Sequence, residues 1–138
     1  MNVKVSYFIS KNIHTVYQAI IDKNHLSKYF VSFASNDLDK AELITWKWED
    51  YNAECQVDQI KTTENQLIEF YWGSETNKRK VAIKLTSESD EKTKITITEF
   101  NFEPAAERIK EIAEQTQGWT DFCCSLKAYL YTGINLRK

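Results

Sequence analysis

A chain of 138 residues is long enough to bury a sizeable core, and we expect a single domain over residues 1–138. Its 18 basic and 20 acidic side chains leave a net charge of −2, which argues against a nucleic-acid-binding protein. No apolar run approaches the ~18 residues that span a bilayer, and the first residues alternate like a strand rather than forming a signal peptide. We therefore expect a cytoplasmic protein without an integral membrane segment.

The first third of the chain predicts a strand followed by two short helices. Residues 3–9 alternate between apolar and polar side chains, which is typical of a strand. Apolar residues recur at helical spacing over 13–21, and Ser10 or Asn12 can cap this helix. We expect a second short helix over 25–29.

Asn24 is the expected N-cap of that second helix. After a possible short strand at 31–34 and a polar loop at 35–40, the chain alternates repeatedly and has polar turns between the alternating stretches. Short connections favour antiparallel neighbours, so we expect a meander with one apolar face. Its expected strands are 43–49, 54–62, 67–72, 81–85 and 93–100.

A long helix is expected to close the domain over 105–132, with one apolar stripe along it. Pro104 suits the first helical position, because its missing N–H would be unpaired there in any residue. Gly118 lies inside the stripe and could kink the helix or divide it in two. Gly133 is the expected C-terminal glycine. A sheet followed by one closing helix predicts an α+β fold in which the helix packs across the sheet.

These elements resemble the helix-grip fold of the START-like (SRPBCC) superfamily over nearly the whole chain. The closing helix carries the most specific part of the resemblance, in Gln117-Gly118-Trp119-Thr120-Asp121-Phe122 and in residues 125–130 and 133–135. It is similar to the C-terminal-domain family of the activator of heat-shock protein 90 ATPase. The strand residues 44–51 and 68–72 support the same resemblance.

The chain departs from that family at several positions. Lys11 stands where many relatives have a proline, and Tyr29 stands where many have a tryptophan. The segment 103–116 is longer and more charged than usual, and we interpret its charged face as solvated. The resemblance therefore implies the fold more firmly than it implies co-chaperone activity.

In this superfamily the space between sheet and helix implies a cavity for a lipid, a sterol or another apolar molecule. The sequence leaves two readings open, because large aromatic side chains can line such a pocket or fill it. The residues expected to face this space are Trp46, Trp48, Phe70, Trp72, Ile83, Ile97, Trp119, Cys123, Leu126 and Leu130.

Glu99 is a carboxylate candidate for this cavity. It shares the strand parity of Ile95 and Ile97, so its carboxylate either faces inward or reaches solvent where the strand ends. Facing inward, it would need a partner or a proton, and could orient a ligand or act as a general base.

The other chemistry-bearing residues suggest no site. His14 and His25 are predicted on the surface, and the basic run 78–80 is interpreted as a solvated hairpin end. Neither zinc-ligand spacing nor a glycine-rich phosphate loop is found in the sequence, so we expect no metal and no cofactor. The odd set of three cysteines, Cys55, Cys123 and Cys124, predicts reduced and mostly buried thiols.

Three functions follow in order of preference. The first is non-enzymatic binding of a hydrophobic or amphipathic small molecule between the sheet and the closing helix. The second is a co-chaperone role, with a heat-shock protein 90-type ATPase as partner. The third is a hydrolase or cyclase that uses the cavity, and it ranks lowest because the sequence shows no acid/base pair. The sequence does not indicate the ligand or the oligomeric state.

Overall fold

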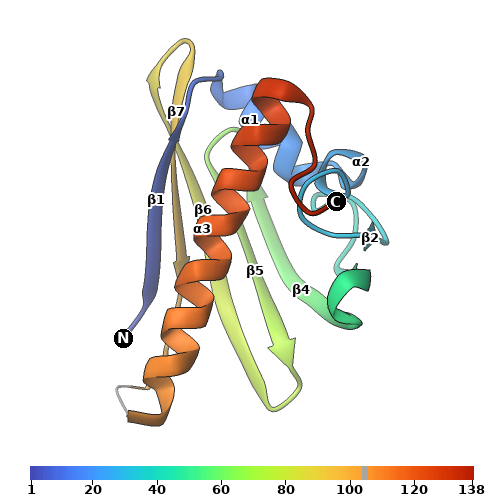
Figure 1. The fold of residues 1–138 in the computed structure, drawn as a ribbon, viewed down its shortest axis with the longest axis vertical. Helices are drawn as coiled ribbons and strands as arrows, with labels where there is room; N and C mark the ends of the chain where they lie inside the picture. The colour runs from blue at the N-terminus through green and yellow to red at the C-terminus, as the bar shows by residue number, and fades with distance from the viewer. Residues whose placement is uncertain (104–105) are drawn as a thin grey trace.

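The computed structural model describes residues 1–103 and 106–138, and in these residues one curved antiparallel sheet is crossed by a long helix (Figure 1). The strand order in the seven-stranded sheet is β1-β7-β6-β5-β4-β3-β2. The α+β helix-grip arrangement predicted from the sequence is confirmed. The elements in chain order are β1 (Val3–Ile9), α1 (Ile13–Ile21), α2 (Lys23–Leu26), β2 (Phe33–Ala34), β3 (Leu43–Trp48), η1 (Glu49–Tyr51), β4 (Ala53–Thr63), β5 (Leu67–Ser74), β6 (Asn77–Ser89), β7 (Lys92–Glu99), η2 (Ala106–Arg108) and α3 (Ile109–Thr132).

The inner face of the sheet is built from rows of side chains that run across neighbouring strands. In one row Ile97 pairs with Val5 on β1 and with Ile83 on β6, and Ile83 pairs with Ile68 on β5. All four side chains are buried. Alternation along each strand therefore gives one continuous apolar face, which the helices must cover.

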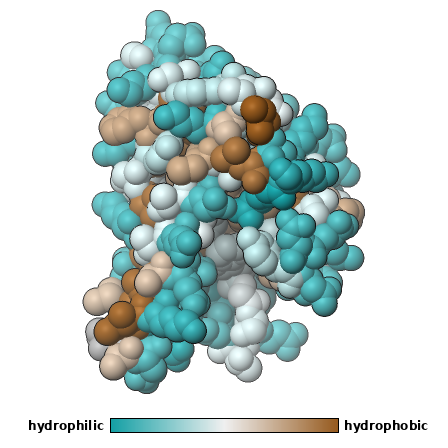
Figure 2. All heavy atoms as spheres, in the orientation of Figure 1, coloured by the Kyte–Doolittle hydropathy of each residue, from teal (hydrophilic) through white to brown (hydrophobic). Residues whose placement is uncertain are grey.

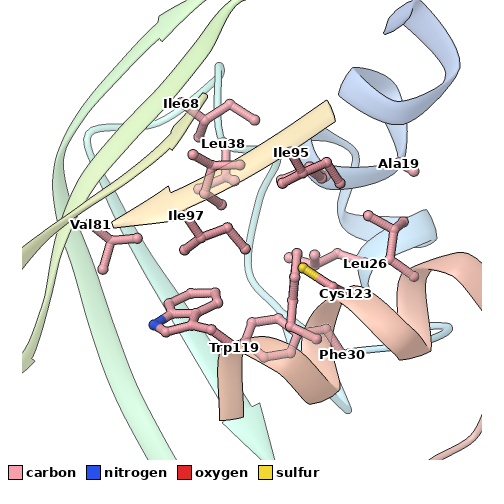
Figure 3. Packing of buried hydrophobic residues seen from close by; sticks show 14 of the residues in the cluster. Ala19, Leu26, Phe30, Leu38, Ile68, Val81, Ile95, Ile97, Trp119 and Cys123 are labelled. Carbon is pink, nitrogen blue, oxygen red and sulfur yellow. The ribbon is translucent and has the colours of Figure 1, made fainter. Parts of the chain in front are cut away.

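α3 covers that face with one side of the helix. Its buried residues follow helical spacing and include Trp119, Cys123 and Leu126. Figure 3 shows Trp119 and Cys123 pointing from the helix toward Ile95 and Ile97 on β7. This contact forms the packed part of the core.

The cap of the second helix differs from the expected one. Asp22, not Asn24, is the N-cap, because its Oδ1 accepts hydrogen bonds from the backbone N–H groups of Asn24 and His25 at 2.7 and 3.1 Å. α2 therefore begins two residues before the predicted start at residue 25. The cap expected for α1 is confirmed, since Asn12 Oδ1 accepts from the N–H of Thr15 at 2.9 Å.

The closing helix also begins later than predicted. α3 starts at Ile109, after the short 3₁₀ turn of η2, so the expected start at residue 105 is wrong. Pro104 and its predicted place in the first turn lie outside the described residues. The helix runs through Gly118 without a break and ends at Gly133, whose φ of 74° confirms the expected C-terminal glycine.

The hairpin of β5 and β6 is longer than the sequence suggested. β5 and β6 stay paired as far as Ser74 and Asn77, so the expected loop at 73–77 reduces to a two-residue turn. Within this hairpin Gly73 has a φ of +114°, and a Cβ there would lie 2.6 Å from the carbonyl oxygen of Asn77. Glycine permits both this backbone and this approach, so polar residues continue a strand that their composition did not predict.

Replacing Gly73 or Gly118 by alanine should change the stability of the protein in opposite directions. Gly118 is helical and a Cβ there meets nothing within 4 Å, so Gly118→Ala should stabilise the protein by about 0.5–1 kcal/mol. Gly73→Ala should destabilise it by about 1–3 kcal/mol, because the methyl group collides with backbone at a positive φ. Urea denaturation of both variants checks the pair. A loss of stability in Gly118→Ala would contradict the helical environment described for this residue.

A tryptophan-lined pocket with a buried carboxylate

A pocket of about 1040 Å³ lies between the N-terminal half of α3 and the adjoining ends of β3 to β7. Figure 2 shows the surface hollowed beside this part of the helix. Strand β4 has a register shift between Asp58 and Lys61, with Gln59 at a φ of 49°. A β-bulge of this kind bends a strand, and here it helps the sheet to curve around the helix.

The apolar wall of the pocket is an aromatic cluster. Trp48, Trp72, Trp119 and Phe30 all line it. The ring centroids of Trp72 and Trp119 are 5.0 Å apart, those of Phe30 and Trp48 are 5.4 Å apart, and those of Trp48 and Trp72 are 6.4 Å apart. Aromatic pairs at these separations attract one another beyond their burial, so the wall is held in place by its own contacts.

Glu99 forms the polar floor of the pocket and is only 2% exposed. It lies in a row of the sheet that is otherwise apolar, paired with Val3 on β1 and Val81 on β6. Of the two readings of its strand position, the structure supports the inward-facing one.

Three N–H donors compensate for the burial of this carboxylate. The indole N–H of Trp72 donates to Oε2 at 3.1 Å, and that of Trp119 donates to Oε1 at 3.0 Å. The side-chain amide of Gln115 donates to Oε1 at 2.9 Å. Both tryptophans are therefore fixed twice, by ring packing and by one carboxylate.

The two arginines in the pocket lining are each paired with a carboxylate. Arg79 donates to Glu111, and its guanidinium lies 3.9 Å from the ring centroid of Phe102. Arg137 donates to Asp121 at 2.7 Å and to the backbone carbonyl of Tyr29 at 3.0 Å. Internal pairing thus neutralises the positive charge of the lining.

Pairing with arginine lowers the pKa of Glu111. Its partial burial acts to raise its pKa, but hydrogen bonds from Arg79 and Arg108 outweigh this effect and hold the pKa below the usual value. The pair with Arg79 connects α3 to β6 at the edge of the pocket. Such a contact limits how far the N-terminal half of α3 can move from the sheet.

Two of the three thiols are poor nucleophiles. Burial raises the pKa of Cys55, which lines the pocket, to about 12, with a smaller contribution from Glu54. Burial likewise raises the pKa of Cys123 to about 12. Since the thiolate is the reactive form, neither group carries nucleophilic chemistry near neutral pH.

Alkylation should report these environments. At about pH 8, iodoacetamide should leave Cys55 and Cys123 unmodified in the folded protein, because both thiols stay protonated and Cys123 is also buried. In urea-unfolded protein all three cysteines should react. Peptide mass spectrometry distinguishes the sites, and rapid modification of Cys123 under folding conditions would contradict its burial.

The structure divides the predicted cavity residues into three groups. Four of them line the pocket, namely Trp48, Trp72, Glu99 and Trp119. Leu130 is only partly buried and packs against the core. The others are buried in the core away from the pocket: Trp46, Phe70, Ile83, Ile97, Cys123 and Leu126. Both readings of the aromatic residues therefore apply, with one region packed and the other open.

Sequence reasoning missed three residues that shape the site. Arg79 was placed on a solvated hairpin end, yet its side chain is only 10% exposed. It shares the strand parity of Val81, and this parity could have identified it. Gln115 lies one helical turn before Trp119, on the same face of α3. Arg137 follows the last helix. No sequence pattern identified it, because only the tertiary fold brings this part of the chain back to the pocket.

The charged face of 103–116 also needs correction. Glu111, Glu114 and Gln115 lie in the pocket lining, so this segment is not wholly a solvated face.

The predicted surface positions of His14 and His25 are confirmed. Among residues 1–103 and 106–138, no group of three or more His, Cys, Asp or Glu side chains is arranged to hold a metal ion. In the same residues, no helix is long and apolar enough to cross a membrane.

The order of elements, the curved sheet and the pocket beneath the closing helix define a START-like helix-grip protein. Residues 11–131 match the family described as Activator of Hsp90 ATPase homolog 1-like protein, and the chain belongs to this family. No match is found among curated proteins.

Solved structures with the same fold cover almost the entire chain. The protein SSP2350 from Staphylococcus saprophyticus is 26% identical, with a TM-score of 0.86 over 99% of this chain and 96% of that one. The Aha1 dimer from Colwellia psychrerythraea is 17% identical, with a TM-score of 0.79 over 96% and 98% of the two chains. DynU16, a putative protein in the dynemicin biosynthetic locus, is 19% identical, with a TM-score of 0.84 over 96% of this chain and 48% of its own.

Proposed function

We propose that this protein binds a hydrophobic or amphipathic small molecule in the tryptophan-lined pocket, without chemical turnover. The pocket itself carries the proposal. Its volume of about 1040 Å³ is at the upper end of the range of about 300–1,000 Å³ that small-molecule sites occupy. One wall is aromatic, as in most small-molecule sites, and the rest of the lining is largely polar or charged, which suits an amphipathic ligand.

The pocket is supported against collapse. Trp72 and Trp119 cannot rotate inward without giving up their hydrogen bonds to Glu99. Trp48 packs on Phe30 and Trp72. A preformed cavity of this kind lowers the cost of ordering the site when a ligand enters.

The side chains of the pocket favour binding over catalysis. Glu99 already accepts three N–H hydrogen bonds, of about four that a carboxylate can accept, so little capacity remains to take a proton from a substrate. Cys55 is a protonated thiol. No histidine is part of the described lining.

Probe binding and pocket blocking test this function together. The neutral fluorophore N-phenyl-1-naphthylamine should bind the purified protein at one site and quench tryptophan emission. Gly118→Phe should abolish this binding, because the side chain at 118 projects into open space in the pocket lining. Ala113→Phe is the matched control, since Ala113 is exposed on the same helix and lies outside the lining.

Native mass spectrometry of the freshly purified protein adds a second measurement. A copurifying small molecule that is absent from Gly118→Phe and present in Ala113→Phe would identify the pocket as its site. A protein that retains no small molecule and binds no apolar probe would overturn the proposed function.

A co-chaperone role is the second candidate, and the family match over residues 11–131 favours it. Exposed apolar side chains gather near the C-terminal end of α3, where Ile134 and Leu136 are 56% and 55% exposed (Figure 2). An ATPase assay with the heat-shock protein 90 of the same organism tests this role. Stimulation that Ile134→Ser abolishes would support it, and no stimulation at saturating protein would overturn it.

A further inference from the structure

We infer that the molecule held in the pocket is an organic cation, in which a quaternary ammonium or protonated amine group is attached to an apolar body. This inference rests on the proposed function of the same pocket and adds the charge of the ligand. It is carried by the environment of Glu99 and by the orientation of the rings around it.

Glu99 is a buried carboxylate without a cationic partner. Its three protein donors are the neutral N–H groups of Trp72, Trp119 and Gln115. Within residues 1–103 and 106–138, no Lys, Arg or His nitrogen lies within 4.0 Å of its oxygens. The three donors replace water around the carboxylate but carry no charge, so an ionised Glu99 leaves the site one positive charge short of neutrality.

The cation nearest to Glu99 in the sheet register already has other partners. Arg79 lies on the same face of β6, two residues from Val81, which pairs with Glu99. Its guanidinium instead donates to Glu111 and lies over the ring of Phe102. The protein therefore holds an arginine close to Glu99 and directs its charge elsewhere.

Two of the rings beside Glu99 keep exposed surface that can attract a cation. Trp72 and Trp119 direct their N–H edges, the positive part of an indole, toward the carboxylate. Trp48 and Trp72 are only half-buried, whereas Trp119 and Phe30 are buried behind them in the aromatic wall. Tryptophan faces are the strongest partners in cation–π contacts, and aromatic walls recognise quaternary ammonium groups.

The charge of the lining agrees with this class of ligand. The lining contains four carboxylates, on Glu99, Glu111, Glu114 and Asp121, but only two arginines. Arg79 and Arg137 each pair with one of these carboxylates, and Glu114 pairs with Lys110, which lies outside the lining. Glu99 has no cation partner in the described residues, so the uncompensated charge of the pocket is negative, which favours a cation and disfavours a fatty-acid carboxylate.

Three probes with the same alkyl chain test the inference. Decyltrimethylammonium, decanol and decanoate are titrated into the native protein below their aggregation limits, with tryptophan fluorescence and calorimetry as readouts. We expect the cation to bind about tenfold more tightly than decanol, through cation–π contacts and the carboxylate, and decanoate to bind weakest. Binding of decanol or decanoate as tight as that of the cation would overturn the cation inference and leave the proposed function standing.

A failure of all three probes to bind would overturn the proposed function together with this inference.

Variants show which residues produce the preference for the cation. Glu99→Gln and Trp48→Leu should each reduce the ratio of cation to decanol affinity severalfold, whereas Glu54→Gln should leave it unchanged, because Glu54 is exposed and outside the lining. If Glu99→Gln does not fold, the ratio in the wild-type protein and in Trp48→Leu still decides. An unchanged ratio in Trp48→Leu would contradict recognition by the aromatic wall.

Discussion

Phe122→Ala is expected to destabilise the protein by about 4 kcal/mol, because the side chain is buried between α3 and the segment that follows α2. Phe122 is 1% exposed. Its ring centroid lies 4.8 Å from that of Phe30, 5.5 Å from that of Trp119 and 5.6 Å from that of Tyr29. Alanine would leave a cavity that these large rings cannot close without losing their own contacts.

Guanidinium denaturation of the variant measures this loss. Phe122→Leu keeps most of the volume, so its loss should be smaller, about 1–2 kcal/mol. Phe33→Ala is a control for the aromatic change itself, since Phe33 is 47% exposed on an edge strand and should cost about 0.5–1 kcal/mol. Equal losses at Phe122 and Phe33 would contradict the packing described here.

The consequences of this packing extend to the pocket. Phe122 is the neighbour of both Phe30 and Trp119, two of the rings that line the pocket. The packed core therefore fixes one side of the aromatic wall, while Glu99 fixes the other side by hydrogen bonds. Stability and binding share the same residues, so binding data from Phe122→Ala must be compared with its folded fraction.

Local patterns predicted most of the fold. Alternation located the strands because each has one buried face, and helical spacing placed Trp119 and Cys123 on the inner side of α3. The predicted start of α3 was wrong because the charged residues before Ile109 are typical of a helix and were assigned to the same helix as Ile109. The cap of α2 was wrong because Asp22 and Asn24 are both good N-cap residues, and the sequence does not show which one is extended.

The pocket was harder to predict than the fold. Strand parity shows which way a side chain points but not whether its space is filled, so Trp46 and Trp48 received the same assignment although only Trp48 lines the pocket. Strand parity also did not determine whether Glu99 is buried, since burial of a carboxylate depends on hydrogen-bond donors from other elements. Its donors come from β5 and α3, and no local pattern connects Trp72 with Trp119.

Glu99→Gln is expected to destabilise the protein by about 3 kcal/mol, although the side chain keeps its size. A carboxylate offers acceptors on both oxygens, whereas an amide offers one oxygen and a second group that donates. The indole N–H of Trp72 or of Trp119 must then face a donor or lose its partner. Glu54→Gln removes the same charge at an exposed position and should cost less than about 0.5 kcal/mol.

A double-mutant cycle with Trp72→Phe separates this hydrogen bond from the packing of the ring. Trp119 and Gln115 both donate to Oε1 and Trp72 donates to Oε2, so a glutamine that keeps its oxygen at the Oε1 position gives up the bond to Trp72. If the bond is formed as described, Trp72→Phe should cost about 1–2 kcal/mol less in the Glu99→Gln background than in the wild-type protein. Additive losses would mean that Trp72 stabilises the fold by its ring contacts alone. In that case Glu99 would not hold the wall of the pocket, and the rings would be free to close over it.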